Sequence, residues 1–281
     1  MNEKKKLQPK VRFREFTGEN APDWEQRKLG EVCNEFDYGL NVAAKEYDGI
    51  NKYLRITDID DDSREFNFDN LTSPDISNNE ITDEYLLRNG DILFARTGAS
   101  VGKTYLYKEL DGKVYFAGFL IRARVGIDNY PYFIFQTTLT EAYAQFVKVT
   151  SQRSGQPGIN AKEYSKYKIY IPKYFEQQMI GTLFEKLDKL ITLHQRKLEQ
   201  LEQLKNTLLS KMFPKSGTNI PEIRFSGFTD TWKQRKAKEI FITISEKGHI
   251  DLPVLSASQE FGMVERNNIG IDIKDKVHII V

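Results

Sequence analysis

The sequence has 281 residues, which is long enough for roughly two domains. Lys and Arg together number 41 and Asp and Glu number 40, so the net charge of +1 excludes a uniformly cationic coat for nucleic acid, and any basic surface must be local. Hydrophobic residues make up 40% of the chain, which is enough to bury a core and excludes a disordered protein.

Residues 1–172 predict a domain that mixes strands and helices. Short runs rich in β-branched and aromatic residues predict strands at 53–57, 91–95, 115–125 and 168–171. Turn signals such as Asn89-Gly90 separate these runs. Residues 132–149 have the spacing of apolar residues that is typical of a helix. The predicted fold class is therefore α+β (mixed α/β).

Residues 173–214 predict a connector built on one long amphipathic helix. A helix over residues 175–212 would span roughly 55 Å. Apolar residues three and four positions apart form a heptad seam, which comprises Ile180, Leu183, Leu187, Leu190, Leu201, Leu204 and Leu208. We expect this seam to pair with another helix as a coiled coil. The alternative is that the helix packs wholly on its own first domain.

A segment near the N-terminus recurs about 210 residues later. Residues 11–17 and 223–229 share the pattern Arg-Phe-x-x-Phe-Thr, and each copy continues to a tryptophan, Trp24 or Trp232, followed by Gln-Arg-Lys. The recurrence predicts two copies of a whole domain. Only about 60 residues follow the start of the second copy, so we expect residues 215–281 to form a truncated domain.

The sequence predicts no catalytic residue and no metal site. Cys33 is the single cysteine, and the histidines His194, His249 and His278 lack the spacing of metal ligands. Residues 98–104 resemble a phosphate-binding loop, but the glycine spacing is one residue short and the following segment favours a strand. With no visible secretory signal and no apolar run of ~18 residues, we expect a cytoplasmic protein.

Two glycine-rich, cationic segments have the composition of DNA-contacting loops. We call residues 96–104 the first glycine loop and residues 150–160 the second glycine loop. Glycine lets the backbone approach a phosphate, and Arg, Lys, Ser and Thr donate hydrogen bonds to it. The side chains of the second loop that can bind a purine edge through two hydrogen bonds are Gln152, Arg153, Gln156 and Asn160. The alternative is a pair of ordinary surface loops with solvated charges.

These features occur together, in order, in one known family. The duplicated opening motif, residues 90–98, and Glu176-Gln177-Gln178 leading into residues 193–198 resemble the DNA-specificity subunit of type I restriction–modification enzymes. The resemblance covers nearly the whole chain. It implies two target-recognition domains that each read half of a bipartite double-stranded DNA site, separated by long helices that pair antiparallel.

The resemblance also implies partners and cofactors. Two modification methyltransferase subunits would dock on the helical spacer and use S-adenosylmethionine, and restriction motor–nuclease subunits would use ATP and Mg²⁺. The specificity subunit itself would be non-catalytic and hold no cofactor. Because the second domain is incomplete here, we expect two chains to pair through the heptad seam as a homodimer that reads a palindromic bipartite site.

The resemblance extends to candidate DNA contacts. The first glycine loop matches a family motif, which makes Arg96, Thr97, Gly98, Ser100 and Lys103 candidates for the DNA backbone. The second loop lies where the family varies with its target, which makes Gln152, Arg153, Ser154, Gln156 and Asn160 candidates for base readout. Two alternatives stay open: an assembly, decoy or silent-cassette product that docks modification subunits without reading DNA, and a nucleotide-binding enzyme that uses residues 98–104.

Overall fold

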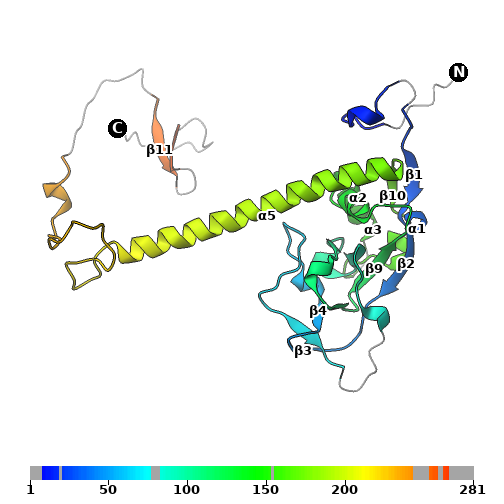
Figure 1. Cartoon of the computed structure of the whole chain (residues 1–281), viewed down its shortest axis with the longest axis horizontal. Coiled ribbons are helices and arrows are strands. Elements are labelled where there is room, and N and C mark those ends of the chain that lie inside the picture. The colour runs from blue at the N-terminus through cyan, green and yellow to red at the C-terminus, as the bar shows by residue number, and fades with distance from the viewer. Residues whose placement is uncertain are drawn as a thin grey trace. The chain divides into compact units, whose positions relative to one another are not determined.

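The computed structural model of the chain describes residues 8–18, 21–76, 83–152, 155–242, 253–258 and 262–265. The chain divides into two compact units, Met1–Glu199 and Gln200–Val281, and the division falls within its longest helix (Figure 1). The first unit mixes strands and helices, which confirms the α+β prediction. We call the part of this unit that precedes the long helix the sheet domain.

A four-stranded antiparallel sheet forms the centre of the sheet domain. Its strand order is β2 (Cys33–Tyr38), β9 (Leu120–Val125), β6 (Asp91–Ala95) and β7 (Thr104–Leu106). Every residue of β6 is buried, because apolar side chains cover both faces of the sheet at this strand. This burial explains why residues 92–95 are all apolar and do not alternate with polar residues.

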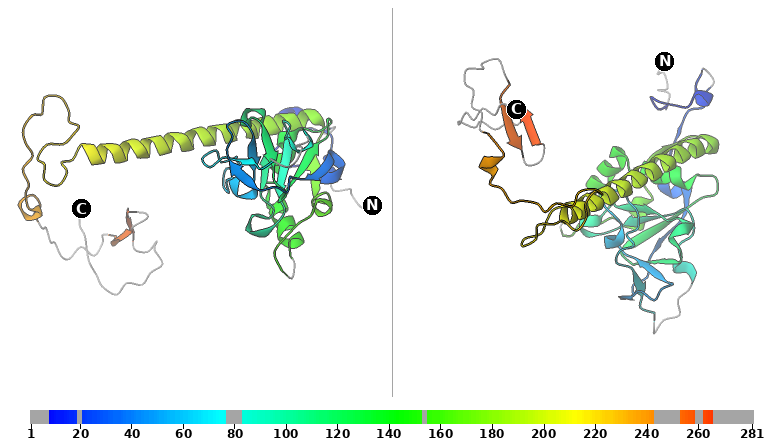
Figure 2. Two further views of the ribbon diagram at one scale, coloured as in Figure 1. Left: turned by 90° about the horizontal axis from the view of Figure 1, so that it is seen from below. Right: turned by 60° about the vertical axis from the view of Figure 1, so that its left-hand side comes forward.

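Shorter elements surround this sheet. The other strand pairs in the first unit are β1 (Glu25–Lys28) with β10 (Lys168–Ile171), β3 (Ala44–Glu46) with β5 (Thr72–Pro74), both antiparallel, and β4 (Lys52–Leu54) with β8 (Val114–Phe116), which is parallel. The short helices are α1 (Leu29–Val32), α4 (Ala161–Tyr164) and the 3-10 turns Arg14–Phe16, Ile56–Asp58, Asp83–Tyr85, Gly98–Ser100 and Glu109–Asp111. Figure 2 shows the first unit in two further views.

The helix expected over residues 132–149 is two helices, α2 (Pro131–Thr137) and α3 (Glu141–Thr150). The break has a local cause, because the Thr140 hydroxyl accepts a hydrogen bond from the Tyr143 amide and so caps a new helix. Both helices contribute aromatic side chains to the core beside the central sheet. The segment is thus helical as expected, with one interruption that the apolar spacing does not reveal.

The strand expected over residues 53–57 ends early, at Leu54. The Asp58 carboxylate accepts hydrogen bonds from the Arg55 amide at 2.9 Å and from the Arg55 guanidinium at 2.8 and 2.9 Å. These bonds turn the backbone into the 3-10 helix that follows β4. A short side chain that bonds to nearby backbone competes with a strand ladder, which explains the early end.

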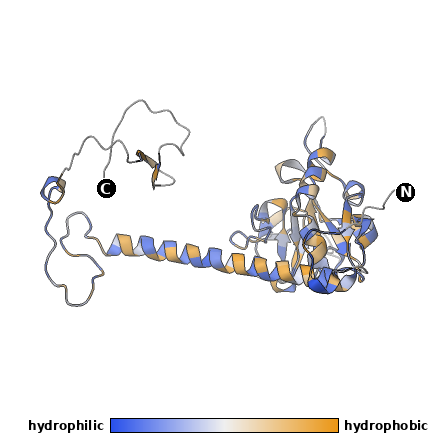
Figure 3. Cartoon of the chain, turned by 90° about the horizontal axis from the view of Figure 1, so that it is seen from above, coloured by the Kyte–Doolittle hydropathy of each residue, from blue (hydrophilic) through white to orange (hydrophobic). Residues whose placement is uncertain are grey.

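The long helix, α5, spans Tyr174–Lys211. Its bounds agree with the prediction of 175–212 to within one residue at each end. Hydrophilic and hydrophobic bands alternate along it, as Figure 3 shows. Its buried residues are confined to the first two turns, at Glu176, Gln177 and Gly181. No helix among the described residues is long and apolar enough to cross a membrane.

The second unit carries the second copy of the repeated motif. Its described elements beyond α5 are the 3-10 turn Ala237–Glu239 and the antiparallel pair β11 (Leu255–Ser258) and β12 (Gly262–Glu265). Residues 233–236, which correspond to strand β1 in the first copy, lie outside any strand. Trp232 packs edge-on against Phe213 at 5.9 Å between ring centroids. Among the described residues, the second copy therefore lacks a counterpart of β1, and its 3-10 turn Ala237–Glu239 lies where the first copy has α1.

The single cysteine gives a direct test of the core. Cys33 is buried beside the central sheet, and burial raises the pKa of its thiol to about 12. We expect the native chain to resist a thiol reagent at pH 8 and the unfolded chain to react. Because folding raises the pKa of this thiol, its contribution to the free energy of unfolding is fully present below the ordinary thiol pKa of about 8.5. The contribution is lost as the pH rises from there toward the folded pKa. Fast reaction of native protein would contradict this burial.

Candidate nucleic-acid interface

The two glycine loops lie side by side although about 50 residues separate them in sequence. Thr97 and Gly158 form an isolated antiparallel bridge between them. The Gly98 amide also donates a hydrogen bond to the Pro157 carbonyl at 3.0 Å. The structure thus joins the segments that were singled out for their composition into one surface.

The backbone of this junction favours glycine at position 98. The φ of Gly98 is 69°, which is a left-handed conformation that side chains disfavour. A Cβ atom there would lie 2.9 Å from the amide nitrogen of the exposed Gln156 side chain. The small residue therefore lets Gln156 of the second loop lie directly over the backbone of the first.

Arg96 is held by an aromatic ring that the sequence did not single out. Its guanidinium carbon lies 5.0 Å from the centre of the Tyr38 ring, in the geometry of a cation–π contact. The Tyr38 hydroxyl in turn accepts a hydrogen bond from the Ala161 amide at 3.2 Å. Tyr38 is 42% exposed, so the stacked pair lies at the surface. The 58 positions between the two residues left no sequence signal for this contact.

Lys103 occupies a different place from the one expected. Its ammonium group donates to the Ile59 carbonyl at 2.9 Å and lies 2.5 Å from an oxygen of Asp61. The side chain is only 8% exposed. These contacts satisfy the ammonium within the protein, so we do not retain Lys103 as a contact for a DNA phosphate.

Asn160 also has a structural role. Its side-chain oxygen accepts a hydrogen bond from the Glu163 amide at 2.9 Å, and a Glu163 carboxylate oxygen accepts one from the Asn160 amide at 2.9 Å. This reciprocal pair is a capping box that starts α4. Reading a base with the same oxygen would break the cap, so Asn160 is a weaker candidate than Gln156.

The remaining candidates divide by position. Arg153 and Ser154 lie outside the described residues, so their predicted role stays a prediction. Gln152 is exposed at the end of α3, and Thr97 and Ser100 are half-buried. Lysines near the second loop are exposed, namely Lys148, Lys162, Lys166 and Lys168. Their charge supports a locally positive surface.

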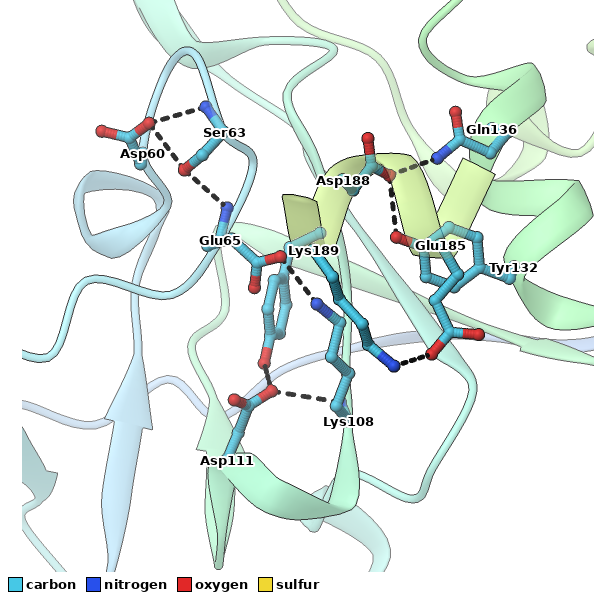
Figure 4. Close-up of polar contacts among 11 residues, drawn as sticks. Asp60, Ser63, Glu65, Lys108, Asp111, Tyr132, Gln136, Glu185, Asp188 and Lys189 are labelled. Atoms are coloured by element: carbon cyan, nitrogen blue, oxygen red, sulfur yellow. Dashed lines mark hydrogen bonds and ion pairs between the residues drawn. The ribbon is translucent and has the colours of Figure 1, made fainter. Parts of the chain in front are cut away.

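The far end of the first glycine loop faces α5 rather than the second loop. A cleft of about 700 Å³ is lined by Ser100 and Lys103 on one side and by Asp188 and Gln195 of α5 on the other. The Tyr132 hydroxyl and the Gln136 amide each donate to Asp188 at 2.8 Å where α5 meets α2 (Figure 4). Of the first glycine loop, only Arg96, Thr97 and Gly98 therefore lie outside the cleft lining, where the second loop joins them.

Catalytic alternatives find no support in the described residues. No group of three or more His, Cys, Asp or Glu side chains among them could hold a metal ion. The loop at 98–104 leads into strand β7, as expected, and not into a helix whose N-terminus could bind phosphate. With its lysine turned inward, this loop lacks the parts of a phosphate-binding loop.

The first unit combines a sheet-centred α+β domain, whose two glycine loops are joined at the surface, with the start of a long helix. Comparison with known proteins identifies the family of this chain. The profile of the type I restriction modification DNA specificity domain matches residues 22–203. The match covers more than half of the chain, and the chain belongs to this family.

Individual proteins are also similar to this chain. The specificity subunit of the type I restriction enzyme MjaVIII from Methanocaldococcus jannaschii is 24% identical over 237 residues, which cover 81% of this chain and 52% of that protein. Among solved structures, the HsdS subunit from Thermoanaerobacter tengcongensis is 21% identical with a TM-score of 0.42, covering 70% of this chain and 51% of that one. The S subunit from M. genitalium is 17% identical with a TM-score of 0.49, covering 68% and 46%. The chain spans about half the length of the relatives it matches.

Proposed function

We propose that this chain recognises a specific double-stranded DNA sequence as the specificity component of a type I restriction–modification system. The observation that carries the proposal is the junction of the two glycine loops, with Arg96 stacked on Tyr38 and Gln156 over Gly98. An arginine oriented by an aromatic ring and an exposed glutamine beside it are the side chains that phosphate and base contacts need. Membership of the DNA specificity domain family supports the same conclusion.

The proposed roles within this surface follow from each side chain. Arg96 and Thr97 contact the DNA backbone, and Gln156 reads a base edge, with Gln152 beside it in the second loop. Ser100 is a backbone contact only if DNA reaches the mouth of the cleft that it lines. Arg153 and Ser154 remain candidates for base readout from the sequence alone.

The chemistry belongs to partner subunits in this proposal. Modification methyltransferase subunits supply S-adenosylmethionine, and restriction motor–nuclease subunits supply ATP and Mg²⁺, while this chain positions them and catalyses nothing. The cytoplasm is the compartment where these partners and DNA meet. A decoy that docks modification subunits without reading DNA stays as the alternative.

DNA recognition is tested by two variants with opposite signatures. A duplex is selected from a randomised pool with the full chain, and its affinity is compared with that of a scrambled duplex. We expect Gln156→Ala to reduce the ratio of the two affinities about 5- to 150-fold, which corresponds to ~1–3 kcal/mol for one base contact. We expect Arg96→Ala to weaken binding to both duplexes equally. It should also lower by about one the salt slope, which is the steepness with which the logarithm of the affinity falls with the logarithm of the salt concentration.

Arg14→Ala is the matched control, because Arg14 is exposed on the N-terminal segment. It should leave both the affinity ratio and the salt slope unchanged. If the unaltered chain binds selected and scrambled duplexes equally, the proposal fails in favour of the decoy.

We also propose that the chain self-associates through α5. Five seam residues are between 43% and 52% exposed, namely Leu183, Leu187, Leu190, Leu201 and Leu204. Ile180 instead packs against the domain core, and Leu208 is half-buried. A leucine row of this length left in water favours pairing with a second helix.

Pairing through the seam is tested by placing a charged side chain in it and measuring the oligomeric state. We expect the chain to sediment as a dimer at micromolar concentration and Leu190→Glu to sediment as a monomer, since a buried carboxylate without a partner opposes helix pairing. Arg196→Glu, exposed and off the seam, should leave the dimer intact. A monomeric unaltered chain would remove self-association and leave pairing with another specificity subunit.

A further inference from the structure

The first turn of α5 contains a fully buried carboxylate. Glu176 accepts hydrogen bonds from Arg12 through both of its oxygens, Nε to Oε1 and Nη2 to Oε2, each at 2.7 Å. The indole nitrogen of Trp24 donates to Oε1 at 3.3 Å. Burying a carboxylate is unfavourable unless its partners are well placed, so this arrangement demands an exact position of the helix start.

The partners of Glu176 are themselves held in place. Arg12 Nη2 also donates to the Pro22 carbonyl at 2.8 Å, and the Trp24 ring packs edge-on against Phe133 at 5.8 Å. Both partners lie more than 150 positions from Glu176 in the sequence. Both belong to the duplicated motif, whose second copy repeats the same arginine and tryptophan. The motif thus meets the helix and not the glycine loops.

Contacts along the next turns restrict the same helix. The Gln177 side-chain oxygen accepts from the Tyr130 amide at 3.0 Å, and its nitrogen donates to the Pro172 carbonyl at 3.0 Å. At Gly181 a Cβ atom would lie 2.6 Å from the Tyr130 ring, so the helix touches the domain through backbone. Asp188 forms the last of these contacts, with α2 (Figure 4).

We propose that Arg12, Trp24 and Glu176 form a clamp that sets the direction in which α5 leaves the sheet domain. These are positioning residues, since none of them belongs to the surface of joined glycine loops. The clamp deepens the proposed function, because the direction of a spacer helix determines where the next DNA half-site can lie. A tilt of about 10° displaces the end of a rod of about 57 Å by roughly 10 Å, or about three base pairs.

The clamp is tested by a distance measured without DNA. Spin labels are attached to the full chain at Lys45→Cys in β3 and Glu199→Cys in α5, both exposed positions, and double electron–electron resonance gives the distance distribution. The labelled chain is diluted into excess unlabelled chain, so that only the distance within one chain contributes, and we expect one narrow peak. Arg12→Lys keeps the charge but loses the two-point fork to the carboxylate, and we expect it to widen the peak about twofold or shift its mean.

Two further variants make the result decisive. Trp24→Phe removes the indole donor and keeps an aromatic ring against Phe133. We expect this variant also to widen the distance peak, and it provides the test if Arg12→Lys does not fold. Arg14→Lys is the matched control at an exposed arginine and should change nothing. Unchanged peaks in folded Arg12→Lys and Trp24→Phe would overturn the clamp, as would an equal change in Arg14→Lys.

DNA binding serves as a separate readout. Arg12→Lys should keep the affinity for a single selected half-site and broaden the range of spacings accepted between two half-sites. A structural defect alone would lower the half-site affinity as well. If the unaltered chain binds no DNA specifically, the proposed function fails while the distance measurement still tests the clamp.

Discussion

Glu176→Ala is expected to lower the free energy of unfolding by about 3–5 kcal/mol, because it leaves the Arg12 guanidinium buried without its carboxylate. The side chain of Arg12 is 5% exposed and that of Glu176 is 0% exposed, so water cannot replace the lost bonds. Trp24 loses its acceptor in the same variant. Urea unfolding followed by circular dichroism measures the change.

The control for this prediction is Glu185→Ala, on the same helix. Glu185 pairs with Lys189 at 2.6 Å, four positions along α5, and the Lys189 side chain is largely exposed. Exposed pairs of this spacing contribute only about 0.3–0.5 kcal/mol, so the control should change stability little. Equal effects of the two substitutions would show that Glu176 has no special role.

A double-mutant cycle isolates the buried pair. Arg12→Met removes the charge and keeps a long apolar stem, and we expect it alone to be destabilising because it leaves the Glu176 carboxylate buried and unpaired. The double variant Arg12→Met with Glu176→Ala removes both charges. We expect it to cost at least about 1 kcal/mol less than the sum of the single changes. Simple additivity would contradict a direct interaction.

Local pattern predicted the elements whose cause is local. Residues 91–95 were predicted as a strand because a short apolar run follows the turn signal Asn89-Gly90. The bounds of α5 were predicted to within a residue because a long heptad row favours one continuous helix. The helix over 132–149 was predicted as one piece, since its interruption depends on the single hydroxyl of Thr140. The early end of the strand at 53–57 likewise depends on one carboxylate, Asp58.

The candidate site could be predicted in composition but not in arrangement. Glycines and cationic residues marked both loops, yet nothing local indicates that Thr97 bridges to Gly158 or that Tyr38 stacks on Arg96. The repeated motif predicted a duplicated domain, but nothing in it indicates that Arg12 binds Glu176. Contacts between distant segments decide these roles, and periodicity carries no information about them.

Lys103→Met is expected to lower the free energy of unfolding by about 1.5–3 kcal/mol, the usual contribution of a hydrogen bond to a charged group. The substitution keeps most of the buried stem and removes the ammonium that satisfies the Ile59 carbonyl. It also removes the ion pair with Asp61, which adds little because the Asp61 side chain is 84% exposed. Thermal or urea unfolding gives the change.

The same variant separates a structural lysine from a DNA contact. Removing a lysine that contacts a DNA phosphate lowers the salt slope of DNA binding by about one. Because the structure turns Lys103 inward, we expect an unchanged slope for Lys103→Met, measured where the variant is fully folded. Lys162→Met is the matched control, since Lys162 is exposed on α4 and its loss should leave stability within about 0.5 kcal/mol. If Lys103→Met has a lower salt slope and unchanged stability, Lys103 contacts DNA, and its ammonium does not bind the Ile59 carbonyl in solution.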